Sequence, residues 1–180
     1  KLKSICKVPD GTYLPVLVRL CLIAADDTVK NIRDVYEGVF KKLLKDNNVG
    51  QKLDDAAALC IETYWKNGTR SFAVAALPAE RRTTVELLIN AQLLVGTVRN
   101  SISGQPQELA FFHDSMQSFL TAVGLFRQPN AWSHLERAAG DPVFMKGRSD
   151  LSGEVGSELF QMCIAVYGPK EMLRDQLRAD

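Results

Sequence analysis

Apolar residues recur along most of the chain at the three- and four-residue spacing that places side chains on one face of an α-helix. The clearest stripe consists of Val29, Ile32, Tyr36, Val39, Phe40, Leu43 and Leu44. Asp27 supplies a side-chain oxygen suited to cap the start of this helix, and Asn47 follows its last apolar residue. The spacing therefore predicts a helix that ends before residue 47.

Five later segments show comparable spacing and are also expected to be helical. They are residues 51–66, 79–99, 106–123, 129–139 and 152–166, and a short amphipathic helix is expected at 169–179. Gly68, Gly140 and Gly168 are expected to end three of these helices, because glycine tolerates the left-handed conformation of a helix stop. Apolar residues wrap most of the way round segment 79–99, which predicts that it lies at the centre of a bundle.

Two segments fit either a helix or a strand. Residues 14–25 are apolar and include Val16, Val18 and Ile23, which suit a buried strand as well as a helix. Residues 71–77 fit a short strand or a buried helical turn. No partner strands are recognisable elsewhere, and a lone strand leaves its backbone polar groups unpaired, so a helix is favoured for 14–25.

These elements predict an all-α fold, a compact and irregular bundle of seven to eight helices. The 180-residue length suits a single domain over residues 1–180, with a flexible loop at 141–151. The 46% hydrophobic and 24% charged fractions are those of an ordinary globular protein rather than a disordered one.

The location of the protein is predicted from its cysteines and from its longest apolar stretch. The four cysteines, Cys6, Cys21, Cys60 and Cys163, include no Cys-x-x-Cys pair, and three of them lie on apolar helical stripes. This favours free thiols in a reducing, cytoplasmic compartment. The apolar stretch from Tyr13 to Ala25 is too short for a membrane span. The first seven residues lack the apolar segment of a secretory signal.

No pattern of catalytic, metal-binding or cofactor-binding residues is recognisable. His113 and His134 have no Cys, His or Glu four residues away that would complete a metal pair, so no metal is expected. Nucleophile elbows, phosphate loops and dinucleotide fingerprints are lacking, and no cofactor is expected. The glycine-containing run 152–157 is best explained as a capped helix start. The protein is therefore expected not to be an enzyme, and an enzyme with an unrecognised site is kept as a further alternative.

Basic residues provide a candidate nucleic-acid site, although the net charge is only +1. Three local clusters would form a phosphate-binding groove if the fold brought two of them together. They are Lys41, Lys42 and Lys45; Arg81 and Arg82; and Lys146 and Arg148. Single-stranded nucleic acid is therefore a predicted alternative partner. The competing interpretation is that these residues are solvated charges on helix surfaces and helix ends.

The C-terminal segment provides a candidate protein-binding surface. Met172, Leu173 and Leu177 form an apolar face at a chain end, of the kind that docks on a partner or on a second copy. Residues 168–171 with 174–175 resemble the opening of the major homology region of retroviral capsid proteins over about ten residues, but Tyr167 and Gln176 depart from that motif. A helix stop followed by a helix start explains this run equally well. The expected function is structural or protein-binding, with self-assembly of the capsid, matrix or nucleocapsid type as one form of it.

Overall fold

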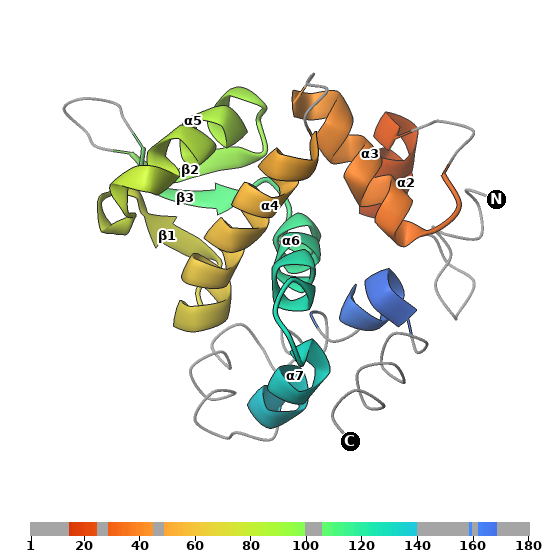
Figure 1. The fold of residues 1–180 in the computed structure, drawn as a ribbon. Helices are drawn as coiled ribbons and strands as arrows, with labels where there is room; N and C mark the ends of the chain where they lie inside the picture. Colours follow the sequence, from red (N-terminus) through yellow and green to blue (C-terminus); the bar gives the residue numbers. More distant parts are fainter. Residues whose placement is uncertain are drawn as a thin grey trace. The chain divides into compact units, whose positions relative to one another are not determined.

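A computed structural model of the chain describes residues 15–24, 29–44, 49–99, 106–139, 159 and 162–168. Their contacts gather into two compact units, Lys1–Gly50 and Gln51–Asp180, and each unit is described by itself. Most of the described residues are helical, and a small sheet belongs to the second unit (Figure 1). The expectation of a mainly helical protein is confirmed, but an all-α class without a sheet is not. A single domain over 1–180 stays a prediction.

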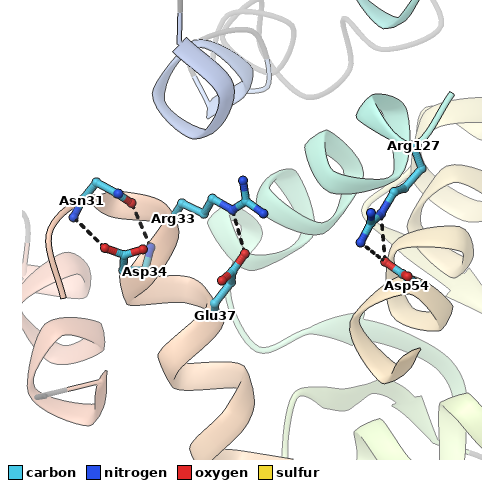
Figure 2. A network of polar contacts seen from close by, with 6 residues as sticks. All are labelled: Asn31, Arg33, Asp34, Glu37, Asp54 and Arg127. Carbon is cyan, nitrogen blue, oxygen red and sulfur yellow. Dashed lines mark hydrogen bonds and ion pairs between the residues drawn. The ribbon is translucent and has the colours of Figure 1, made fainter. Parts of the chain in front are cut away.

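The first unit contains two helices that pack on each other, α2 (Pro15–Ala24) and α3 (Ile32–Leu44). The helix favoured for residues 14–25 is thus confirmed. Asn31 caps α3: its Oδ1 accepts from the N–H of Asp34 at 3.0 Å, and Asp34 Oδ2 accepts from the N–H of Asn31 at 3.2 Å. Figure 2 shows this reciprocal capping box, which satisfies free N–H groups at the helix start. Asp27, which was expected as the cap, lies outside the described residues.

The second unit contains the remaining elements of the described chain. In chain order they are α4 (Val49–Cys60), the π-helical turn η1 (Ile61–Trp65), β1 (Ser71–Ala73), the 3-10 turns η2 (Val74–Ala76) and η3 (Ala79–Arg81), α5 (Arg82–Asn90), β2 (Leu94–Arg99), β3 (Pro106–Phe111), α6 (Asp114–Phe126) and α7 (Ala131–Ala139). Residues 162–168 form a further helical segment. The helices expected at 51–66 and 129–139 are confirmed. The loop expected at 141–151 and the helix expected at 169–179 lie outside the described residues.

The three strands form an antiparallel sheet in the order β1-β3-β2. Phe72 of β1 lies opposite Leu109 of β3, and Leu94 of β2 lies opposite Phe111 of β3. These four side chains are buried, and the period-2 alternation of strands puts them on one face. Helix α5 lies beside β2 in Figure 1. The ambiguous segment 71–77 proves to be a strand followed by a 3-10 turn.

The single helix expected over residues 79–99 is wrong beyond Asn90. After that residue α5 ends in a Schellman-type stop, in which Gln92 has a φ of 59° and the N–H of Leu93 donates to the carbonyl oxygen of Leu88 at 2.9 Å. Leu88 and Leu93 are both fully buried, and this burial offsets the strain of a non-glycine residue in the left-handed region. The chain then continues as β2.

The helix expected to open at Pro106 is also wrong at its start, because residues 106–111 form β3. Proline is tolerated as the first residue of a strand, where no ladder N–H is required. The helix itself begins at Asp114. Its cap is His113, whose Nδ1 accepts from the N–H of Ser115 at 3.1 Å.

Helix α6, not segment 79–99, is the most deeply buried helix among the described residues. All eleven residues from Ser115 to Leu125 are buried. One cluster of buried core residues joins η1, α6, α7 and the last helical segment; it consists of Ile61, Tyr64, Ala122, Leu125, Trp132, Leu135, Leu159 and Cys163. The inward placement expected for Trp132 and Leu135 is therefore confirmed. Because Ile61 and Tyr64 belong to this cluster, core packing holds η1 in place.

Candidate binding groove

A groove of about 510 Å³ lies beside β1, and it is named here the β1 groove. Its lining residues come from η1, from β1 and from the turns that follow them. They are Glu62, Thr63, Lys66, Asn67, Thr69, Ser71, Phe72, Ala73, Ala76, Leu77 and Pro78. The volume falls within the range of roughly 300–1,000 Å³ that is usual for ligand sites.

The groove follows a strand that has one neighbour among the described strands. All three residues of β1 line it, and β1 stands at the end of the sheet beside β3. No residue of β3 contributes to the lining, whereas residues of η1, which contacts β1, do. Terminal strands of a sheet are the usual place at which extended segments bind as added strands.

The two walls of the groove differ in chemistry. The apolar residues Ala76, Leu77 and Pro78 follow β1 in the chain and contribute to the lining, as does the buried Phe72 of β1. Charged and polar side chains line the other part, where η1 and the turn after it contribute Glu62 and Lys66 together with three uncharged polar residues. A ligand that fits must therefore combine apolar and polar groups.

The π-helical turn positions the polar wall. An i→i+5 turn inserts one extra residue into a helix, and such turns are frequent at functional sites. In η1 the side chains of Ile61 and Tyr64 are buried in the core, while Glu62 is accessible at the groove. The helix ends at Gly68, which has a φ of 73° and whose N–H donates to the carbonyl oxygen of Tyr64 at 2.8 Å. The chain then turns directly into β1.

An ion pair fixes the carboxylate of the polar wall. Arg81 donates from Nε to Glu62 Oε2 at 3.0 Å and from Nη2 to Glu62 Oε1 at 2.6 Å, so both carboxylate oxygens are held. Hydrogen bonding to Arg81 is the main reason that the pKa of Glu62 is lowered, and the same bonds raise the pKa of Arg81. Both groups stay charged near neutral pH.

The ion pair predicts a pH dependence of stability. Because the pKa of Glu62 lies below the ordinary value of 4.5 in the folded protein, the stabilisation is complete above that value and is lost as the pH falls through the folded-state pKa. We expect Glu62→Gln to lower the urea midpoint slightly at pH 7, and to make no difference once the pH is well below the folded-state pKa. Urea titrations from pH 7 to pH 3 measure this. The control is Glu86→Gln in α5, and an equal pH response in both variants would contradict the assignment.

The basic residues expected to bind nucleic acid fall in different places. Arg81 is the ion-pair partner of Glu62, while its neighbour Arg82 is exposed at the start of α5. Lys41 and Lys42 are exposed near the end of α3, in the first unit. Lys45, Lys146 and Arg148 lie outside the described residues. Nucleic-acid binding by these clusters stays a prediction.

The histidines and cysteines of the described residues cap a helix, lie on the surface or are buried in the core. His113 caps α6, and His134 is exposed on α7. Cys21, Cys60 and Cys163 are buried and form no disulfide; burial raises the pKa of Cys60, and it raises the pKa of Cys163 to about 12. Within the ranges that the structure describes, no three His, Cys, Asp or Glu side chains gather as a metal site.

The predicted C-terminal binding surface, Met172, Leu173 and Leu177, lies outside the described residues.

Among the helices that the structure does describe, none has the length and apolar character needed to cross a membrane. The chain gave no match to a protein-family model, to a curated protein or to a solved structure. The β1 groove was not predicted from the sequence.

Proposed function

We propose that this protein is a protein-interaction module, and that its β1 groove binds an extended segment of a partner protein as an added strand. The observation that carries the proposal is that the groove is lined by all three residues of a strand that is terminal in the described sheet. Main-chain hydrogen bonds to β1 supply affinity in this mode of recognition, and the groove walls supply selectivity.

The charges in the groove favour binding over catalysis. A general acid or base works best with a pKa near the working pH. Hydrogen bonds from Arg81 move the pKa of Glu62 away from that range. The groove thus offers fixed charges and an apolar wall, which position a ligand without exchanging protons with it.

A bulky side chain at Ala76 tests the proposal. Ala76 lines the groove and is exposed, so Ala76→Trp fills the groove without disturbing the core. The probes are decapeptides selected on the full chain from a random displayed library, with binding measured by fluorescence anisotropy. We expect Ala76→Trp to weaken binding about tenfold or more, because the added strand and the indole compete for one space.

Ala75→Trp is the matched control for this experiment. Ala75 is the preceding residue of the same turn, is equally exposed and does not line the groove. Binding to this variant should stay within about twofold of the wild-type value, as is usual for a change outside an interface. Failure of the library to yield any binding peptide, or equal binding to both tryptophan variants, overturns the proposal.

A further inference from the structure

The charges at the β1 groove indicate which kind of segment it accepts, and this inference rests on the function proposed above. Glu62 and Lys66 are the two charged residues of the lining. Both oxygens of Glu62 are already held by Arg81, as the distances of 3.0 and 2.6 Å show. An incoming cation would therefore have to compete with a guanidinium for that carboxylate.

Lys66 stands differently from Glu62. It is exposed at the end of η1, where the side chain can reach into the groove, and its charge lies near enough to Glu62 to help lower the pKa of that carboxyl. Arg81 itself, and Asp55 and Glu80, which act electrostatically on it, do not line the groove. Of the two charged side chains in the lining, Glu62 is held by hydrogen bonds and Lys66 is exposed, so Lys66 is the charged group that a ligand can approach.

The apolar wall sets the second requirement. Leu77 and Pro78 flank the exposed Ala73 and Ala76, and small side chains at these two positions leave room for a larger one from a ligand. Successive side chains of an added strand point to opposite sides, so residues two positions apart share one side. The polar and apolar walls can then be reached by neighbouring or alternate residues of one strand.

We infer that the β1 groove selects an extended peptide segment that carries an acidic side chain close to an aliphatic one, with the carboxylate at Lys66 and the aliphatic group against Leu77 and Pro78. A partner protein is the source of this segment. A carboxylate on a small metabolite would meet the same lysine but would not use the edge of β1.

The experiment repeats the peptide selection on three forms of the full chain: wild type, Lys66→Gln and Lys66→Glu. The wild-type protein should enrich peptides with Asp or Glu next to an aliphatic residue. Replacing that acid by its amide should weaken binding about three- to tenfold, as expected for a partly exposed charge pair. Lys66→Gln should remove the preference, and Lys66→Glu should reverse it toward Lys or Arg. Lys30→Glu, an exposed lysine of the first unit, is the control for a general charge effect.

The outcomes separate this inference from the proposed function. Peptides that Ala76→Trp displaces, but that show no acidic preference and no response to Lys66, overturn the inference and leave the binding function in place. Peptides that lose affinity equally with Lys30→Glu and Lys66→Glu also overturn it. Failure to select any peptide overturns both. Acetate or glutamate binding as tightly as the selected peptides would contradict the role of the strand edge.

Discussion

Replacing Gly124 by alanine is expected to lower the free energy of unfolding by about 2–3 kcal/mol, although alanine is the better helix former. Gly124 lies in the buried part of α6, where a Cβ atom would come within 2.6 Å of Ile61 Cγ1 and 2.9 Å of the carbonyl oxygen of Ala57. The second neighbour is backbone and cannot rotate away, so helix α6 or α4 has to shift. Urea denaturation followed by circular dichroism measures the loss.

Gly50→Ala is the matched control for Gly124→Ala. A Cβ at Gly50 would meet nothing within 4 Å, so this helical glycine should accept alanine with unchanged or slightly raised stability. Ile61→Ala provides a second test, because it removes the clashing Cγ1. The cost of Gly124→Ala measured in the Ile61→Ala background should be smaller by about 1 kcal/mol or more. Equal costs in both backgrounds would show that the contact with Ile61 does not contribute to the cost.

Replacing Arg70 by alanine is the second change with a large expected effect, about 2–3 kcal/mol of destabilisation. The Nη1 atom of Arg70 donates to the carbonyl oxygen of Asp114 at 2.9 Å and to Ser118 Oγ at 3.1 Å, and the guanidinium lies 4.5 Å from the centre of the Tyr64 ring. Gln117, which is fully buried, returns a hydrogen bond from Nε2 to the carbonyl oxygen of Arg70. The substitution keeps this main-chain acceptor but removes the donors to Ser118 Oγ and, at 3.5 Å, to Gln117 Oε1, so two buried side chains of α6 are less well satisfied.

Arg127→Ala is the control for Arg70→Ala. Arg127 also makes two hydrogen bonds, to Asp54 Oδ1 at 3.0 and 2.7 Å, but its side chain is 62% exposed (Figure 2). Exposed ion pairs contribute about 0–1 kcal/mol, so this variant should unfold close to the wild-type midpoint. Similar losses in the two arginine variants would show that burial around Arg70 adds nothing.

Helical periodicity predicted most of the helices because they bury one face. Helix α3 and helix α7 show a clear stripe, and the buried positions Val39 and Trp132 lie on it. The stop signals at Gly68 and Gly168 are also correct, since both residues have a positive φ. The spacing of apolar residues and the residues of the turns are sufficient to predict a helix that has one solvent-exposed face and one buried face.

Strands β2 and β3 were expected to be helical because the evidence for them in the sequence is weak or misleading, whereas the segment of β1 was left open between strand and helical turn. Gln92 ends α5 in a left-handed conformation that glycine or asparagine would normally signal. Beyond it, Leu94 and Val95 continue an apolar run that fits a helix as well as a strand. Only the pairing of β2 with β3, a contact between distant parts of the chain, decides between them. Tertiary context thus overrides local propensity here.

The β1 groove could not be predicted for a related reason. Its lining residues all lie between residues 62 and 78, but none of them belongs to a recognisable motif. The groove exists because β1 is placed at the end of the sheet and because η1 presents Glu62 and Lys66 on its accessible side. Arg81 was expected to belong to a phosphate-binding basic cluster. Its ion pair with Glu62 depends on the fold and not on the local sequence.

The π-helical turn at Ile61–Trp65 has a consequence for how this protein can vary over evolution. Each residue added to or removed from a helix rotates everything after it by about 100°. A one-residue deletion in this turn would rotate Lys66 away from the β1 groove and would shift Gly68 relative to the carbonyl group that its N–H binds. Most substitutions would leave both residues in place. Homologues that keep the binding site are thus expected to vary here in amino-acid identity but not in the number of residues.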